Sequence, residues 1–182
     1  MTTAPSTAFT RREPELVGQT VVIIGGSAGI GLETARRARA EGAEVILAAR
    51  RPDRLRQAAA EAGAGSTAAF DATDPAALER FLTGLPTPVD HVMVTGPGPY
   101  YAPLAELDRE RAHRAFDDHQ WLAVEVARHS AGRVRPGGTL LFMGGTAGRS
   151  RGRGLSLIAA ATAAMPALIA NLAVEIAPSG ST

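Results

Sequence analysis

The regular alternation of short apolar runs with longer Ala-rich amphipathic segments constrains the fold of this chain more than any other feature. Continuous apolar runs are typical of strands buried on both faces, and the longer segments carry the periodicity of helices. We expect strands over residues 20–24, 45–49, 66–70, 89–95 and 139–143. We expect helices over residues 30–41, 52–62, 75–82, 108–130 and 155–176. This order predicts an α/β fold, a doubly wound parallel sheet with helices on both faces in three layers.

The chain is expected to form one structural domain. Its 182 residues fit a single domain, and no repeat or linker interrupts residues 17–182. Residues 1–16 are polar and Thr-rich, and we expect them to form a disordered N-terminal tail.

Composition excludes several kinds of chemistry. All 19 basic residues are Arg, since the sequence holds no Lys, and it holds no Cys. The missing Lys excludes Schiff-base enzymes and Walker-type phosphate loops, and the missing Cys excludes thiol catalysis, disulfides and thiolate metal sites. The net charge of +1 argues against broad nucleic-acid binding. His91, His113 and His129 lack the spacing of metal ligands, so we expect no metal.

The segment 155–177 is apolar enough to raise the question of a membrane span. It carries Pro166, Asn171 and Glu175 and consists largely of Ala, which favours a buried helix of a soluble protein. No apolar signal core follows the N-terminal residues. We therefore expect a cytoplasmic protein with no membrane partner.

A glycine-rich segment, Ile-Gly-Gly-Ser-Ala-Gly-Ile-Gly over 24–31, joins the first expected strand to the first expected helix. Glycines let backbone N–H groups approach a phosphate closely, and a helix N-terminus favours its negative charge. In open α/β sheets, ligands bind beyond the carboxyl ends of the strands. The segment therefore predicts a phosphate-binding loop, and the alternative is a tight turn without a ligand.

This segment resembles the fingerprint T-G-x-x-x-G-x-G of the short-chain dehydrogenase/reductase superfamily. Gly25, Gly29 and Gly31 match its glycines, and Ile24 stands where the Thr usually is. The resemblance runs over about 17–178 and implies a Rossmann-like domain that binds NAD(P). The cofactor-binding residues that it implies are Gly25, Ser27, Ala28, Gly29, Ile30, Gly31, Arg50, Arg51, Asp71, Ala72, Thr95 and Gly96.

The end of the second expected strand bears on the choice between the two dinucleotides. NAD-preferring members of the family place an acidic residue near the position of Ala49, and here that residue is small and Arg50 and Arg51 follow it. Guanidinium groups suit a 2′-phosphate, which they grip bidentately. The resemblance thus implies NADP(H) in preference to NAD(H). The alternative is a solvated pair of arginines at a helix start.

Two further segments are similar to family motifs. In Phe-Asp-Ala-Thr-Asp over 70–74, the resemblance gives Asp71 a contact with the adenine amino group, while Asp74 is more simply a helix N-cap. The family's N-N-A-G falls at 94–97, where both asparagines are missing; Thr95 and Gly96 still bring the backbone close to the cofactor.

The resemblance breaks at the catalytic positions. The family's Ser, Tyr, Lys and Asn fall at Gly145, Ile158, Thr162 and His119. In the family, Tyr is the acid/base, Lys lowers its pKa and Ser hydrogen-bonds the reacting oxygen. Ile has no proton to give and Thr carries no charge, and the chain has no Lys elsewhere. The standard mechanism of the family is therefore excluded.

Other residues remain candidates for catalysis: Tyr100, Tyr101, His119 and Thr146. A Tyr beside a His or Arg can donate a proton to a carbonyl oxygen during hydride transfer. The alternatives are aromatic packing for the tyrosines and a half-buried, hydrogen-bonded His119. The basic loop 149–154 either attracts an anionic substrate or cofactor phosphate, or is a solvated lid.

The sequence stops at 179–182, whereas the family normally continues into two more parallel strands. We therefore expect a sheet that lacks the last strands of the family fold, in a truncated chain or one whose sheet edge a partner covers. The family's dimerisation through two long helices implies a homo-oligomer through 108–130 and 155–176. Two hypotheses follow: an NADP(H)-dependent oxidoreductase with a non-standard active site and a small carbonyl or alcohol substrate, or a catalytically silent nucleotide-binding domain or pseudoenzyme.

Overall fold

The computed structural model describes residues 15–177. Its strands are β1 (Thr20–Ile24), β2 (Glu44–Ala49), β3 (Ser66–Ala69), β4 (Val89–Val94) and β5 (Val134–Phe142). Its helices are α1 (Gly29–Ala40), α2 (Pro52–Ala62), α3 (Pro75–Thr83), α4 (Arg109–Ser130) and α5 (Ser156–Ile176). Two short 3₁₀ helices, η1 (Leu104–Glu106) and η2 (Ala147–Arg149), lie in the loops after β4 and β5. Of the predicted tail 1–16, residues 1–14 lie outside the described residues, as do residues 178–182; the N–H of Leu16 donates to the carbonyl oxygen of Glu41 at 3.0 Å.

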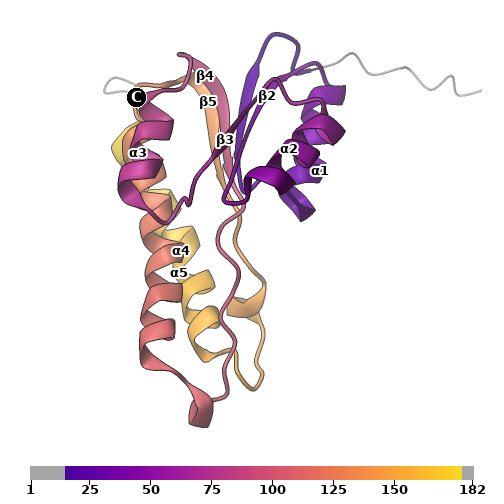
Figure 1. Ribbon diagram of the computed structural model, residues 1–182. Coiled ribbons are helices and arrows are strands. Elements are labelled where there is room, and N and C mark those ends of the chain that lie inside the picture. The colour runs from indigo at the N-terminus through magenta and orange to yellow at the C-terminus, as the bar shows by residue number, and fades with distance from the viewer. Residues whose placement is uncertain (1–14, 178–182) are drawn as a thin grey trace, which may run out of the picture.

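The strands form one parallel sheet in the order β3-β2-β1-β4-β5. Figure 1 shows α1 and α2 on one face of this sheet and α3, α4 and α5 on the other. The predicted three-layer, doubly wound α/β fold is therefore confirmed. The order reverses between β1 and β4, which is where an open sheet of this kind leaves a crevice for a ligand.

The central strand β1 divides the core between the two faces. Val21 and Ile23 belong to the cluster that packs under α1 and α2, and Val22 and Ile24 belong to the cluster under α3 and α4. Successive side chains of a strand point to opposite faces, so a strand buried on both faces is apolar at every position. This explains why the short apolar runs identified the strands.

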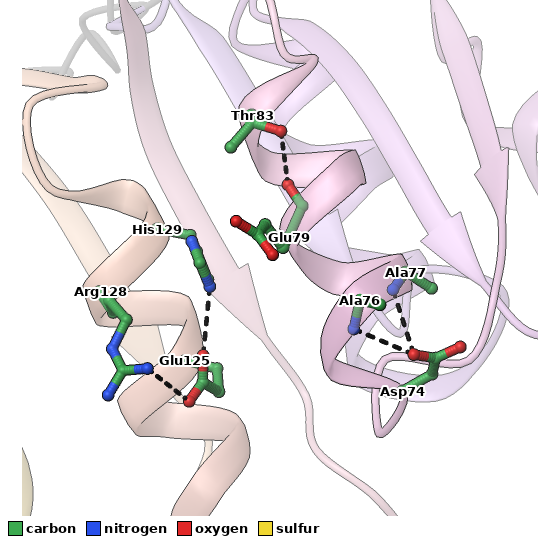
Figure 2. Close-up of polar contacts among 8 residues, drawn as sticks. All are labelled: Asp74, Ala76, Ala77, Glu79, Thr83, Glu125, Arg128 and His129. Carbon is green, nitrogen blue, oxygen red and sulfur yellow. Dashed lines mark hydrogen bonds and ion pairs between the residues drawn. The ribbon is translucent and has the colours of Figure 1, made fainter.

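Asp side chains define two helix starts. Asp74 accepts hydrogen bonds from the backbone N–H groups of Ala76 and Ala77 at 3.0 and 3.2 Å, as Figure 2 shows, and Pro75 occupies the first helical position. Asp108 accepts one from the N–H of Arg111 at 2.7 Å at the start of α4. Both satisfy N–H groups that a helix leaves unpaired. The prediction that Asp74 is an N-cap is confirmed, and Asp108 caps α4 in the same way.

The fifth strand begins at Val134, so the prediction that it begins at Thr139 after a glycine turn is wrong. Val134 pairs with Val89 and Thr139 pairs with His91, which leaves extra residues of β5 bulged between the two pairs. Gly137 supplies the positive φ of +80° that this irregularity needs. Two adjacent glycines thus mark a bulge inside the strand.

The helix α5 is less buried than expected. Its buried residues Ile158, Ala161, Thr162 and Met165 lie in its first half, and only 22% of its most apolar stretch is buried. The prediction of a buried helix is therefore wrong for most of its length, because β5 is an edge strand and no further strand of the described chain lies beside the second half of α5. By length and composition, α5 is the one helix within residues 15–177 that is able to cross a membrane.

Candidate functional site

A cavity of about 590 Å³ lies at the carboxyl ends of the strands, at the switch point between β1 and β4. It lies within the range of volumes that ligand sites occupy. Its walls come from the ends of β1 and β2, the loops after β1, β2, β3 and β4, and one residue each of α2 and α4. The lining residues are Ile24, Gly25, Ser27, Ala28, Ala48, Ala49, Arg50, Arg51, Arg54, Phe70, Asp71, Ala72, Thr73, Thr95, Gly96, Pro97 and Leu122.

The loop after β1 requires glycine at two positions. Gly25 has a φ of +92°, and a Cβ there would collide with the hydroxyl of Thr95. A Cβ on Gly31 would lie 2.5 Å from the carbonyl oxygen of Gly25, so the first turn of α1 packs directly on the loop. Glycine thus lets three backbone segments converge at one wall of the cavity.

This convergence places the N-terminus of α1 at the cavity. The N-cap residue Ala28 has no side chain that caps the helix, and the first turn contains no acidic residue. The first N–H groups of a helix have no partner within it and carry partial positive charge. The wall formed by Ser27 and Ala28 is therefore suited to a phosphate group.

Three of the residues implied by the sequence resemblance stand apart from the cavity lining. Gly29, Ile30 and Gly31 form the first turn of α1, and the side chain of Ile30 is 58% exposed. Their backbone follows the phosphate-suited wall directly, so a role for them would come from their N–H groups and not from side chains.

The end of the cavity beside β2 is basic. Arg50 and Arg51 follow β2, as the sequence predicted, and Arg54 in the first turn of α2 joins them in the lining. Within residues 15–177, none of these three arginines pairs with a carboxylate; Asp53 pairs with Arg56 instead. Sequence reasoning missed Arg54, although a residue one helical turn beyond the Arg pair returns to the same side of α2.

The end of the cavity beside β3 is acidic and aromatic. One carboxylate oxygen of Asp71, Oδ1, accepts hydrogen bonds from the backbone N–H and the hydroxyl of Thr73 at 3.0 and 2.9 Å. These bonds fix the orientation of the carboxylate, and in the described part of the chain its Oδ2 has no donor. Phe70 lies next to Asp71 in the lining and its ring packs on Phe81, with centroids 4.9 Å apart. An oxygen acceptor beside an aromatic ring is suited to a base that carries an amino group.

A second carboxyl group lies close enough to interact with Asp71. The pKa of Asp118, on α4, is raised above its usual range, first by burial and second by the negative charge of Asp71. The neighbouring Asp117 raises it further, whereas the charges of His119 and Arg114 lower it. Among the described residues, Asp118 is the group whose pKa departs most clearly from its usual value.

The loop after β4 closes the cavity on the other side. The hydroxyl of Thr95 donates toward the carbonyl oxygens of Ile24 and Gly25 at 3.3 and 3.4 Å, which ties this loop to the glycine loop. Gly96 has a φ of +75° and no atom within 4 Å of the position of a Cβ, so its backbone faces open space. Thr95 and Gly96 therefore both line the cavity.

Three of the four residues at the catalytic positions that the sequence resemblance implies, Gly145, Ile158 and Thr162, pack against one another. Ile158 is 6% exposed, and the hydroxyl of Thr162 donates to its carbonyl oxygen at 2.8 Å. A Cβ atom added at Gly145 would lie only 3.0 Å from the methyl group of Thr162. These side chains hold neither a free proton donor nor a charge.

Of the four candidate catalytic residues, Tyr100 contacts residues of α4 and its N-cap, and Tyr101 is exposed to solvent. The hydroxyl of Tyr100 accepts a hydrogen bond from the N–H of Asp108 at 3.0 Å, and Arg111 lies over its ring at 5.1 Å. Tyr101 is 58% exposed. Both tyrosines therefore lie away from the cavity lining, in line with a packing or surface role.

Thr146 and the basic loop lie on the exposed segment after β5. Thr146 precedes η2, and its carbonyl oxygen accepts from the hydroxyl of Ser150 at 3.3 Å. In the loop 149–154, Arg153 lies 3.8 Å from Glu106, and Gly154 accepts a backbone hydrogen bond from Ala102. The loop is thus attached to the segment after β4 but leaves Arg149 and Arg151 in solvent.

His119 differs from the other candidates because it lines a recess of about 20 Å³ under the carboxyl ends of β4 and β5. Its ring atom Nδ1 lies 2.8 Å from the carbonyl oxygen of Ala115. The other residues of the recess are Val94, Gly96, Pro97, Leu122, Ala123, Phe142, Met143 and Met165. No group of three or more His, Cys, Asp or Glu side chains suited to a metal occurs in the described residues.

These features fit a dinucleotide. The backbone wall suits phosphate, the arginines suit a second anionic group, and the Asp71 end suits an adenine ring. The glycine cradle, formed by Gly25 and Gly31, supports the fit of a dinucleotide phosphate to this wall, because a Cβ atom at either position would collide with neighbouring atoms.

Comparison with known proteins gives the same picture. The sequence profile of the short chain dehydrogenase family matches residues 19–181. A Streptomyces antibioticus protein named "Probable oxidoreductase" is 37% identical over 99 residues, which are 51% of this chain and 33% of the relative. "Short-chain dehydrogenase/reductase ATR9" of Stachybotrys chlorohalonatus is 28% identical and covers 91% of this chain and 71% of its own. The chain thus spans about a third of the first of these relatives.

Solved structures resemble the chain over most of its length. A short chain dehydrogenase/reductase family protein superposes with a TM-score of 0.79 at 29% identity, covering 89% of this chain and 70% of that one. The crystal structure of BdcA in complex with NADPH gives a TM-score of 0.83 at 26% identity, covering 91% of this chain and 68% of that one.

Proposed function

This chain belongs to the short-chain dehydrogenase family, and we propose that its cavity binds NADP(H) in preference to NAD(H) for hydride transfer with a small carbonyl or alcohol substrate. The observation that carries the proposal is the combination of the glycines at the start of α1 with three arginines in one cavity, none of which pairs with a carboxylate within residues 15–177. The similar protein BdcA was solved with NADPH, which supports the choice of dinucleotide.

In this proposal the cavity residues divide by the part of the dinucleotide that they hold. The backbone around Gly25, Ser27 and Ala28, continued by Gly29, Ile30 and Gly31, holds the pyrophosphate at the N-terminus of α1. Asp71 accepts a hydrogen bond from the adenine amino group through Oδ2, beside Ala72. Thr95 and Gly96 carry the backbone past the ribose on the β4 side.

Arg50, Arg51 and Arg54 hold the 2′-phosphate. Arginine suits this role because its planar fork binds two phosphate oxygens at once. NAD(H) has no phosphate there, so these guanidinium groups discriminate between the two dinucleotides. When bound, NADPH supplies a hydride to a carbonyl carbon and NADP⁺ accepts one from an alcohol.

The first prediction concerns Arg50. We expect Arg50→Ala to weaken NADPH binding by about tenfold or more, because the substitution removes a charge-assisted phosphate contact worth about 1.5–3 kcal/mol, and to leave NADH binding unchanged. Isothermal titration calorimetry with both dinucleotides measures the two affinities. The matched control is Arg128→Ala, an arginine on α4 that pairs with Glu125. Equal weakening of NADPH and NADH would overturn the role of Arg50.

A second candidate function is a catalytically silent nucleotide-binding domain. The apolar contact among Gly145, Ile158 and Thr162 favours it, because these positions carry the family's proton chemistry. In this alternative, NADPH binds but no carbonyl compound accelerates its oxidation. Spectrophotometric turnover assays with a panel of aldehydes and ketones therefore distinguish the two functions.

We also propose a cytoplasmic homo-oligomer in which α4 and α5 form the interface. The exposed apolar side chains of these two helices support this arrangement; Trp121 is 57% exposed and Val174 is 78% exposed. An oligomer would remove the outer face of α5 from solvent without a membrane.

A further inference from the structure

We propose that His119 is the catalytic acid/base of this protein, which gives a proton to the oxygen of a carbonyl substrate and takes it back from the alcohol. The proposal rests on the proposed NADP(H)-dependent function. Its starting point is the recess under β4 and β5, in which His119 is the one polar side chain among the lining residues. Its volume of about 20 Å³ has room for about one water molecule.

The recess adjoins the proposed cofactor cavity. Gly96, Pro97 and Leu122 line both. The 2′-phosphate and adenine sites lie at the ends of β2 and β3, whereas the recess lies at the ends of β4 and β5, on the other side of β1. A dinucleotide that binds its adenosine half at Asp71 and crosses the glycine loop therefore directs its other half toward His119.

The hydrogen bond of His119 determines which ring nitrogen is free. Nδ1 lies 2.8 Å from the carbonyl oxygen of Ala115, and a carbonyl oxygen only accepts, so Nδ1 carries a hydrogen. Nε2 is then the nitrogen that gains and loses a proton. Within residues 15–177, Nε2 has no hydrogen-bond partner.

A carboxyl group on the same helix interacts with the His119 ring. The charge of His119 lowers the pKa of Asp118, which indicates that the two groups interact. Asp118 therefore lies close enough to interact with a charge that develops on the ring during proton transfer. Asp71 and Asp117 add negative charge around Asp118, and Arg114 opposes it.

The chemistry balances with one proton and one hydride. In reduction, bound NADPH would supply the hydride: a C–H bond of its dihydronicotinamide breaks, a C–H bond forms at the carbonyl carbon, and the C=O π pair moves to oxygen. The oxygen takes the Nε2 proton of the imidazolium, which leaves an alcohol, NADP⁺ and neutral His119. Oxidation of an alcohol reverses each transfer. Such general acid catalysis contributes about 10²–10⁴-fold to a rate.

The test with a readout besides activity is ¹⁵N NMR of the histidine rings. The chain has four His, so the spectrum of His119→Gln assigns the His119 signals by their absence. We expect saturating NADP⁺ to shift the Nε2 resonance of His119, and adenosine 2′,5′-bisphosphate, which lacks the nicotinamide half, to leave it unchanged. An unchanged His119 signal while calorimetry shows that NADP⁺ binds would overturn the inference and leave the proposed binding function intact. If calorimetry detects neither ligand, the proposed function fails and the inference fails with it.

Kinetics provide the second arm. With small aldehydes and ketones, His119→Gln is expected to lower kcat by about 10²-fold or more while the Kd for NADPH stays unchanged. His113→Gln is the matched control, because His113 is exposed on the same helix. Wild-type turnover retained in His119→Gln, or no turnover of any compound by the wild type, contradicts the catalytic role.

Discussion

Single residues give the cavity its polarity. Arg50, Arg51 and Arg54 make the β2 side cationic, and Asp71 makes the β3 side an acceptor. These opposite ends lie beside neighbouring strands, and together they suit a ligand that presents an anion and an amino group. A 2′-phosphorylated adenosine has this pattern.

The protonation of Asp118 predicts a pH-dependent stability. Because burial and Asp71 raise the pKa of Asp118 above its usual 3.8, the folded chain binds this proton more tightly than the unfolded chain. The stabilising contribution is therefore complete below the usual pKa and is lost as the pH rises through the folded-state pKa. We expect Asp118→Asn to raise the free energy of unfolding at pH 7 by about 0.5 kcal/mol and to have a smaller effect near the usual pKa.

Urea denaturation across this pH range measures the effect. Asp117→Asn on the exposed side of α4 is the matched control and is expected to change stability less. A loss of stability in Asp118→Asn at neutral pH would contradict this account of the site's electrostatics.

At the scale of helices and strands, the sequence predicted those features that depend on residues close together in the chain. The caps Asp74 and Asp108 were identifiable because a cap acts within one helical turn. The start of β5 was missed because Pro136, Gly137 and Gly138 are turn residues by local criteria, and only pairing with β4 shows that they form a bulge. The partial burial of α5 was missed for a similar reason, because burial depends on the neighbouring strands.

The cap of α3 provides a prediction at this scale. We expect Asp74→Ala to lower the free energy of unfolding by about 1 kcal/mol, because the N–H groups of Ala76 and Ala77 lose their acceptor. Asp74→Ser should recover most of the loss, since a hydroxyl also caps. Chemical denaturation of the three proteins checks this, and equal stability of Asp74→Ala and wild type would contradict the capping role.

At the scale of the whole molecule, the fold was predictable and the site only in part. The apolar runs predicted a parallel sheet, and the glycine loop predicted a ligand site at the carboxyl ends of its strands. In the structure, this site is the crevice between β1 and β4, where the strand order reverses. Arg54 and the recess at His119 depend on how separate segments meet in space. The sequence placed His119 among four candidates, and the recess distinguishes it from Tyr100, Tyr101 and Thr146.

The proposed assembly is testable on intact protein. We expect multi-angle light scattering to give a dimer or larger oligomer for the wild type and a smaller mass for Ala164→Arg, which places a charge on the exposed face of α5. The control is Ala60→Arg on the exposed side of α2. A monomeric wild type, or equal masses for the wild type and Ala164→Arg, would contradict an interface through α5.

The central claim is that the cavity binds NADP(H) and selects it through the 2′-phosphate. Calorimetric titration of the wild-type chain with NADPH and with NADH tests it most directly. The account predicts saturable binding of both with NADPH tighter by about tenfold or more, in keeping with a charge-assisted phosphate contact. Absence of binding, or NADH binding as tightly as NADPH, would contradict it.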